Sequence, residues 1–545
     1  MSETLRRWRR SALFVSTLLL ACVVVAPAAA LAHSRSGPPT AVTRDGIVQG
    51  LSAGGVDKFL GIPYAAPPVG SLRWQDPQPP ARWHGVRSAT TLPPACPQLA
   101  NSNGPRSENE DCLYLSVYVP HGSSGARADA GRWRGLPVLF WIHGGGLTTG
   151  TGNQHDGTLM ATTNHVIVVS INYRLGVFGF LALPGLSAEA SDHASGDYGL
   201  LDQEAALRWT RDNIGSFGGD PRNVTIAGES AGAYSICSLL TSPPARGLFA
   251  RAAMESGSCI STPLASAEQT GTQFASASGC TETDPAAVAA CMRSKTPGEL
   301  LDNPDYPGAD SPTWGGSELP ADPAVSVAAG RFTRVPLLIG TNHDEGRTFA
   351  QGLAGLDEQQ YDGLIQSQYG ANASQVLAHY PFSAFPSPYT AAYAAGAVWT
   401  DSGFIGGIGG CAAQNLEQEF RAHTPTFAYQ FDDRNAPGLN HSLPGYMWGA
   451  GHAMELAYMW PSFDNGFPLY PLLTPAQLEL SNWMVRYWGA FARYGAPIVR
   501  GQTFWPPYQS GRMMSLRQGN GSVAISDAEF GAEHNCSFWD SLPTG

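Results

Sequence analysis

A serine between a buried strand and a helix is the first residue whose setting points to chemistry. The segment 224–232, VTIAGESAG, places Ser230 in a G-x-S-x-G pattern, and a helical pattern follows it. A serine at such a turn is held in a strained backbone conformation, and glycines two residues before and after it avoid collisions with neighbouring backbone. The helix that starts beyond Ser230 favours negative charge on an attacked carbonyl oxygen. Ser230 is therefore the predicted nucleophile; the alternative is a chance match in a chain with 63 glycines.

A glycine-rich turn is the second element of this chemistry. The apolar run 137–142 is followed directly by His143-Gly-Gly-Gly146. Glycines leave backbone N–H groups free to approach a substrate oxygen without side-chain interference. We expect the N–H groups of Gly145, Gly146 and Ala231 to form an oxyanion hole, whereas the structural alternative is a plain glycine turn.

A serine hydroxyl is a weak nucleophile, so a histidine base and an orienting carboxylate are also required. With this type of serine turn, the chain order is serine, acid, histidine. His452 lies in the small-residue loop 449–456, GAGHAMEL, and is the first candidate. His441 is second, but its context Asn440-His441-Ser442 is typical of a surface loop. The other histidines downstream of Ser230 are His343, His379, His423 and His534.

The acid is expected after a strand that lies between the serine and the histidine. The segment 335–346, VPLLIGTNHDEG, supplies Asp344 and Glu345 directly after an apolar run. Either carboxylate could orient an imidazole, and an acidic pair in this position is also typical of a solvated turn. The pattern alone does not choose between Asp344 and Glu345.

These residues need a scaffold, and the chain alternates apolar runs with helical patterns. Continuous apolar runs suit strands buried on both faces, and strand–helix alternation favours a mostly parallel sheet with helices on both sides. The segments 263–329 and 353–401 have mixed periodicity and are interpreted as insertions that cap the sheet. The expected strands are 138–142, 166–173, 224–227, 335–339 and 427–431, and the expected helices are 203–214, 231–240 and 475–494.

The helix at 475–494 has clear signals at both ends. Thr474 is the expected N-cap, with Pro475 at the first helical position and Gln477 completing a capping box. Gly495 follows the last turn, where a left-handed residue commonly ends a helix.

Several motifs in order resemble the type-B carboxylesterases, the family of cholinesterases and fungal lipases in the α/β-hydrolase fold. The resemblance covers nearly all of the chain beyond residue 32 and implies one catalytic domain at 33–545. It selects Glu345 rather than Asp344 as the acid and His452 as the base. It also implies two structural ion pairs, Arg73 with Glu110 and Arg174 with Asp202. The motifs are FLGIPYAAPPVGSLRW at 59–74, SENEDCLYL at 107–115, NYRLGVFGF at 172–180 and GLLDQ at 199–203.

Cysteine usage indicates an oxidising compartment. Without Cys22, eight cysteines remain, an even number that suits disulfides. No CxxC or HExxH pattern is present, so a metal site is not expected. Hydrolysis by a serine, a histidine and an acid needs no metal or organic cofactor. The family resemblance supports three of the pairings, and Cys237–Cys259 rests on spacing alone. The expected bridges are Cys96–Cys112, Cys280–Cys291, Cys411–Cys536 and Cys237–Cys259.

The first 32 residues have the pattern of a secretory signal peptide. Four arginines precede an apolar run, and Ala30-Leu31-Ala32 offers a cleavage site after Ala32. The context of Cys22 resembles a lipoprotein box, but apolar residues follow it. The run is too short to span a bilayer, and no later segment suits a transmembrane anchor. Removing this segment changes the formal net charge from −12 to −15, which disfavours nucleic acid and anionic membranes as partners.

The composition and motifs together predict a secreted or periplasmic serine carboxylic-ester hydrolase acting on a small ester. With 43% hydrophobic residues and 14 tryptophans, the chain is folded rather than disordered or collagen-like. The loop 96–112 contains no Trp, the residue with which cholinesterases hold a quaternary ammonium, so choline esters are not expected. Lipase, peptidase and noncatalytic binding functions are the alternatives. The oligomeric state is open.

Overall fold

The computed structural model describes residues 37–101, 103–121, 135–308, 311–440 and 442–543. The expected signal segment, with Cys22 and the cleavage site after Ala32, lies outside these residues. All elements described below belong to the compact unit Pro39–Gly545. A single catalytic domain at 33–545 stays a prediction.

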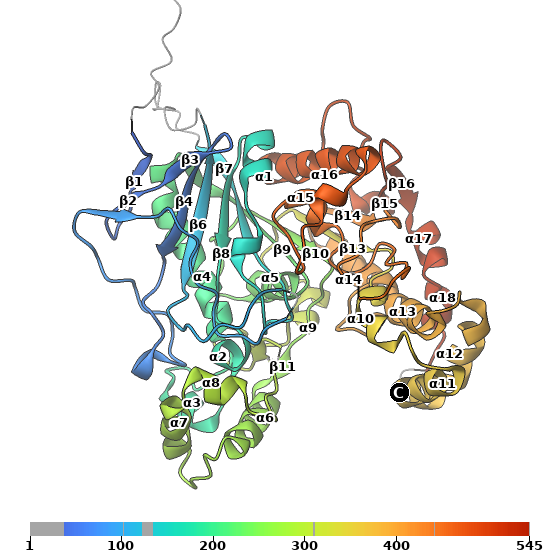
Figure 1. Cartoon of the computed structure of the whole chain (residues 1–545), viewed down its shortest axis with the longest axis horizontal. Helices are drawn as coiled ribbons and strands as arrows, with labels where there is room; N and C mark the ends of the chain where they lie inside the picture. Colours follow the sequence, from blue (N-terminus) through green and yellow to red (C-terminus); the bar gives the residue numbers. More distant parts are fainter. Residues whose placement is uncertain (1–36, 102, 122–134, 309–310, 441, 544–545) are drawn as a thin grey trace, which may run out of the picture. The chain divides into compact units, whose positions relative to one another are not determined.

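A mixed sheet of eleven strands forms the centre of the described part of the chain (Figure 1). The neighbouring strands β8, β7, β9, β10, β13, β14 and β15 pair in parallel. Antiparallel strands complete the sheet at both edges. In spatial order they are β16 (Val523–Ser526), β15 (Arg512–Leu516), β14 (Thr426–Phe431), β13 (Leu337–Asn342), β10 (Arg251–Glu255), β9 (Gly219–Glu229), β7 (Leu136–Ile142), β8 (Ile167–Ile171), β6 (Tyr114–Pro120), β4 (Val56–Pro63) and β3 (Leu51–Ala53).

The mostly parallel sheet flanked by helices is confirmed. The five expected strands correspond to β7, β8, β9, β13 and β14. The expectation did not include the antiparallel edges, because strands such as β3 and β16 are short and partly exposed and carry no continuous apolar run. Two smaller sheets complete the strands of the described residues, with β1 (Thr40–Val42), β2 (Ile47–Gln49) and β5 (Val86–Ser88) in one and β11 (Thr262–Pro263) and β12 (Thr313–Trp314) in the other.

The central strands are apolar on both faces because each face has its own core. In β7, Phe140 belongs to the core that contains Leu207 of helix α4 (Tyr198–Asn213) and Ile236 of helix α5 (Ala231–Thr241). The next residue, Trp141, points to the opposite core with Trp488 of helix α16 (Pro475–Tyr494). The two-residue period of a strand therefore divides one apolar run between two helical layers.

The ends of α16 are those expected from the sequence. Thr474 accepts a hydrogen bond from the Gln477 amide, and the Gln477 side chain accepts from the Thr474 amide, which completes the capping box. Gly495 adopts a left-handed conformation with φ 75° and ends the helix.

The segments interpreted as insertions are largely helical. The first contains α6 (Leu264–Ala277), α7 (Pro285–Ser294), α8 (Pro297–Leu301) and α9 (Pro323–Ala328), and the second contains α11 (Glu358–Tyr369), α12 (Ala373–His379) and α13 (Thr390–Ser402). α13 is buried along most of its length, and a helix buried on most sides lacks the polar stripe that would reveal its period. The remaining helices are α1 (Thr158–Asn164), α2 (Gly176–Phe180), α3 (Pro184–Glu189), α10 (Gly346–Ala350), α14 (Gly410–Arg421), α15 (Leu456–Met459), α17 (Asp527–Glu533) and α18 (Cys536–Trp539).

Four disulfides join cysteines in the described part of the chain, and their pairings are those expected from the sequence. Three close short loops, and the fourth joins α14 to α18 across a sequence separation of 125 residues. They are Cys96–Cys112, Cys237–Cys259, Cys280–Cys291 and Cys411–Cys536.

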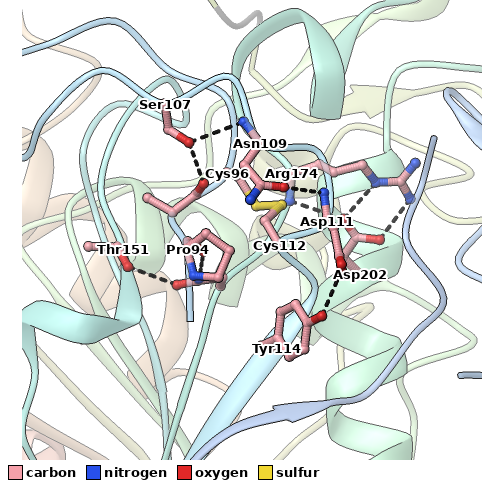
Figure 2. Close-up of a disulfide and its surroundings, with 12 residues drawn as sticks. Pro94, Cys96, Ser107, Asn109, Asp111, Cys112, Tyr114, Thr151, Arg174 and Asp202 are labelled. Atoms are coloured by element: carbon pink, nitrogen blue, oxygen red, sulfur yellow. Dashed lines mark hydrogen bonds and ion pairs between the residues drawn. A yellow bond between two sulfur atoms is a disulfide. The ribbon is translucent and has the colours of Figure 1, made fainter. Parts of the chain in front are cut away.

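Both expected ion pairs are present; Arg174 and Asp202 are buried, and buried Arg73 pairs with partly buried Glu110. Arg73 donates two hydrogen bonds of 2.6 Å to the Glu110 carboxylate, and Arg174 donates two of 2.7 Å to Asp202. Figure 2 shows the Arg174 pair in the surroundings of the Cys96–Cys112 disulfide. Such forked, fully paired charges fix the loops that carry them.

Candidate active site

The turn at Ser230 connects β9 to α5 and has the strained geometry expected for it. Ser230 has φ 56° and ψ −121°, and its amide donates a 2.8 Å hydrogen bond to the Glu255 carbonyl at the end of β10. A Cβ on either Gly228 or Gly232 would collide with the Ile142 carbonyl oxygen of β7. Only glycine fits at these two positions, so the G-x-S-x-G pattern follows directly from the packing of β9 and α5 on β7.

Hydrogen bonds connect Ser230, His452 and Glu345 in one line. The Ser230 Oγ lies 2.9 Å from the His452 Nε2, and the His452 Nδ1 lies 2.7 Å from a Glu345 carboxylate oxygen. The other oxygen of Glu345 accepts from the Thr341 hydroxyl at 2.8 Å and from the Asn342 amide at 2.7 Å. The exposed fractions of the three residues are 9%, 6% and 1%. The end of β13 therefore holds the carboxylate in place for the imidazole.

Asp344, the other acid that the sequence pattern allowed, forms hydrogen bonds with groups other than His452. Arg434 donates two hydrogen bonds of 3.0 and 2.8 Å to the Asp344 carboxylate, and the Ala450 amide donates another. Burial alone would raise the pKa of Asp344, but the neighbouring His343 and the two guanidiniums of Arg347 and Arg434 hold it well below its usual range. Asp344 thus joins three segments, and the carboxylate bonded to His452 is that of Glu345.

The other histidine candidates contact different groups. His534 bonds to Asp401 and Gln430, His343 lies 3.5 Å from Asp344, and His379 stacks on Phe538. His423 packs edge-on against Phe332, and His441 lies outside the described residues. Among the described histidines, the structure brings His452 to Ser230.

The glycine turn after β7 faces the same cavity as Ser230. Gly145 has φ 106°, and a Cβ there would collide with the Thr149 carbonyl oxygen. Among the described residues, neither the Gly145 nor the Gly146 amide donates a backbone hydrogen bond. Ala231 is the first residue of α5, where the helix leaves its amides unpaired. Gly145 and Gly146 line the same cavity as Ser230, and unpaired amides in such a place can donate to an anionic oxygen.

The cavity above Ser230 has a volume of about 490 Å³, and its described lining contains no Lys or Arg. Amide and apolar side chains line much of it, together with Glu229, Thr348 and the histidines His143, His155 and His452. The amides are Asn103, Gln154, Gln351, Asn440 and Asn465, and the larger apolar groups are Tyr234, Phe349, Ile405, Ile408, Leu456 and Phe463. This size and lining suit a small organic substrate.

A second carboxyl group lies beside the imidazole, and motif reasoning assigned it no role. A Glu229 oxygen is 3.2 Å from the His452 Nε2. Burial raises the pKa of Glu229 to about 8. Burial alone would lower the pKa of His452, but the carboxylates of Glu229 and Glu345 outweigh it and raise that pKa. Glu229 directly precedes Ser230 in the motif, a position from which its closeness to the base could have been inferred.

Two further acidic residues, Glu455 and Glu255, are buried near Glu229. Burial raises the pKa of Glu455 to about 7 and that of Glu255 well above its ordinary value. The Glu455 carboxylate accepts a hydrogen bond from Asn342, and Glu255 accepts one of 2.7 Å from Trp488. These contacts depend on the packing of β10, β13 and α16, so the sequence pattern alone did not reveal them.

The geometry can support nucleophilic attack by a serine hydroxyl assisted by a neutral imidazole. Metal chemistry has weaker support. Among the residues that the structure describes, the one close group of three metal-ligating side chains is Cys280, Glu282 and Cys291, and both of its sulfurs are joined in a disulfide.

The chain is similar over most of its length to known carboxylesterases. Residues 37–539 match the sequence profile described as "Carboxylesterase family". "Cocaine esterase" of Homo sapiens is 36% identical over 490 residues, covering 84% of this chain and 83% of the relative. "Carboxylesterase 1D" of Rattus norvegicus is 33% identical, covering 87% and 88%. A solved structure of a "PNB esterase" is similar with a TM-score of 0.73 and 31% identity, covering 91% of this chain and 100% of that one.

Proposed function

Because this chain belongs to the carboxylesterase family of ester hydrolases, we propose that it cleaves carboxylic esters with Ser230 as nucleophile, His452 as base and Glu345 as orienting acid. Its fold is the α/β-hydrolase fold of the similar esterase structures. The observation that carries the proposal is the continuous line of hydrogen bonds from Ser230 through His452 to Glu345 at the floor of the cavity.

The proposed reaction has two halves. The Ser230 Oγ attacks the ester carbonyl while the His452 Nε2 accepts its proton, and Glu345 stabilises the resulting imidazolium. The amides of Gly145, Gly146 and Ala231 donate to the oxyanion. When the carbonyl re-forms, the C–O bond to the alcohol breaks, and His452 protonates the departing alkoxide. Water then gives its proton to His452 and attacks the acyl-enzyme, which releases the acid and returns the proton to Ser230.

We also propose that the protein is exported. The four disulfides support an extracellular or lumenal location, because such bonds persist in oxidising compartments. Within the described residues, no helix has both the length and the apolar character needed to cross a membrane. The leader pattern at 1–32 supports the same proposal from the sequence.

The names of the relatives point to varied esters. They include "Pyrethroid hydrolase Ces2e" of Rattus norvegicus and "Fumonisin B1 esterase" of Sphingopyxis macrogoltabida. We therefore propose a small-molecule ester substrate without assigning one by name. Choline esters are not proposed, since the loop 96–112 contains no Trp. Acylglycerol hydrolysis by the same residues is the alternative activity, and a panel of acyl esters of graded chain length separates it from short-ester hydrolysis.

The decisive test is Ser230→Ala. This variant removes the nucleophile, so we expect kcat for 4-nitrophenyl butyrate to fall by roughly 10⁶-fold. A fluorophosphonate probe should label the wild-type protein and leave Ser230→Ala unlabelled. Near-normal hydrolysis by the folded variant would refute the assignment, and a wild-type protein that neither hydrolyses esters nor accepts the probe would support a noncatalytic binding protein.

A further inference from the structure

One wall of the cavity contains a buried amide that the proposed reaction does not use. Asn465 lines the cavity and is 9% exposed. Its side chain makes no hydrogen bond to any residue that the structure describes. The Asn465 amide atoms are not among the fully buried atoms without a partner, so they are open to the cavity, where a substrate group can take up hydrogen bonds that no described residue makes.

The other amides of the cavity contrast with Asn465, because each one is paired within the protein. Asn440 donates to the Gln351 side chain at 3.0 Å, and Gln351 donates to the Thr348 carbonyl at 3.2 Å. Gln154 donates to the Asp464 carbonyl at 2.9 Å, and Asn103 donates to the Thr149 hydroxyl at 3.3 Å. Of the five amides in the described lining, Asn465 is the one whose hydrogen-bonding groups are all available.

His155 is a second polar group in the cavity lining whose ring lacks a well-aligned partner. It is 2% exposed, and neither ring nitrogen makes a well-aligned hydrogen bond to a described residue, although the Thr151 backbone lies close enough to raise the pKa of the ring slightly. Its ring packs against Trp141 at 5.1 Å, Trp460 at 5.6 Å and Phe463 at 6.0 Å between centroids. Burial, with some repulsion from a second histidine, lowers the pKa of His155 to about 3. The ring is therefore neutral near pH 7 and offers one N–H donor and one acceptor.

The described lining offers no cationic side chain to a negatively charged substituent. No Lys or Arg is among the described residues that line the cavity, so nothing there neutralises a substrate carboxylate. Asn465 and His155 are both uncharged, and each can donate and accept. Phe463, which contacts His155, also lines the cavity and adds an apolar surface for the chain that carries the polar group.

We propose that Asn465 and His155 form a subsite for an uncharged hydroxyl or amide group of the ester. The inference rests on the proposed ester hydrolysis, and it adds a substrate class: esters that carry a neutral hydrogen-bonding substituent at a distance from the scissile bond. Both residues act on specificity, since neither contacts Ser230, His452 or Glu345 through a hydrogen bond.

The test uses matched pairs of esters that differ in one terminal hydroxyl. The alcohol arm compares alkyl butyrates with ω-hydroxyalkyl butyrates of two to six carbons, and the acyl arm compares methyl alkanoates with methyl ω-hydroxyalkanoates. A third set carries a terminal carboxylate. Acid release is followed by pH-stat titration, and each pair gives a ratio of kcat/KM. We expect wild-type protein to favour the hydroxyl member in one arm, which assigns the subsite to the alcohol or the acyl half.

The variants Asn465→Leu and His155→Phe each remove hydrogen-bonding groups of the subsite and leave a side chain of similar volume. Each should lower the hydroxyl-to-alkyl ratio by roughly 2- to 12-fold, the effect of losing a neutral hydrogen bond. The matched control Asn440→Leu removes an amide that is paired within the protein, so it should change both members of a pair alike. Thermal unfolding checks that the variants fold, and His155→Phe supplies an independent measurement if Asn465→Leu does not.

Four results distinguish the possible failures. An unchanged ratio in both folded variants overturns the subsite, and so does a wild-type preference for the terminal carboxylate. Loss of the proposed function looks different, because wild-type protein would then hydrolyse no ester in the panel, or Ser230→Ala would hydrolyse the panel as well as wild type.

Discussion

Two carboxyl groups within reach of one imidazole make the charge of His452 sensitive to its neighbours. Glu345 lies at Nδ1, and Glu229 lies near Nε2, where Ser230 also bonds. Since Glu229 has a pKa raised to about 8, it ionises in a range that overlaps the titration of a histidine whose pKa is also raised. The two groups therefore titrate as a coupled pair.

A pH profile of Glu229→Gln checks this coupling. The proposed base must be neutral, so kcat/KM rises with pH as His452 loses its proton. Glutamine removes a negative charge that favours the imidazolium, so the pKa of His452 should fall and the rising limb should move to lower pH by about one unit. A limb that stays in place or moves to higher pH would contradict the coupling. Glu229→Asp, which retains the carboxyl group, is the matched control.

Gly145 tests the proposed oxyanion hole at a single backbone position. In Gly145→Ala the new Cβ collides with the Thr149 carbonyl, and the turn must shift, which displaces the amide donors. We expect kcat/KM to fall by about 100- to 1000-fold, the effect of losing one donor. The control is Gly363→Ala in α11, where a Cβ meets nothing within 4 Å; it should retain wild-type activity. Equal activity of the two variants would exclude a role for this turn.

At the scale of elements, α16 is the helix with the most complete end signals, and its N-cap can be tested alone. Thr474→Ala removes the hydroxyl that accepts the Gln477 amide. The free energy of unfolding should decrease by about 1 kcal/mol, whereas Thr474→Ser should be nearly neutral. Urea unfolding followed by circular dichroism measures both. An alanine variant as stable as wild type would show that packing on β7 and β9 alone holds this helix.

The sequence was enough to predict a structural element or a site residue where its geometry depends only on residues close by in the chain. Gly228 and Gly232 surround Ser230 because of one turn, and the capping box of α16 lies within four residues. Asp344 and Glu345 could not be separated locally, because both follow β13 and only the partners Arg434 and His452 differ. The family resemblance selected Glu345, and the geometry is consistent with it.

Other features depend on packing between distant segments and were not predicted. Glu229 lies beside His452 although the two residues are 223 positions apart in the sequence. Asn465 differs from Asn440 only in that its side chain lacks a hydrogen-bond partner within the protein. α13 was missed because its Ala-rich sequence is buried along most of the helix and shows no amphipathic period.

At the scale of the molecule, the Cys411–Cys536 disulfide closes the longest of the four cross-linked loops. The cross-link limits the unfolded chain, and its effect grows with loop length, to about 5 kcal/mol for a loop of roughly 100 residues. The double variant Cys411→Ala/Cys536→Ala should therefore lose more stability than Cys280→Ala/Cys291→Ala, whose separation is 11 residues. Differential scanning calorimetry of both proteins gives the comparison. A larger loss of Tm in the second variant would contradict the loop-length argument.

The reacting residues lie at the ends of sheet strands, whereas part of the cavity wall lies in connecting segments. This division has an evolutionary consequence. Ser230 and Glu345 lie at the ends of β9 and β13, and buried hydrogen bonds to the sheet hold them. Ile405, Leu439 and Asn465 lie in connecting segments between helices and strands. Mutations in these segments can change which ester fits while the reacting groups keep their positions. A directed-evolution library confined to the connecting segments should therefore yield altered selectivity at a higher frequency than random mutagenesis of the whole gene.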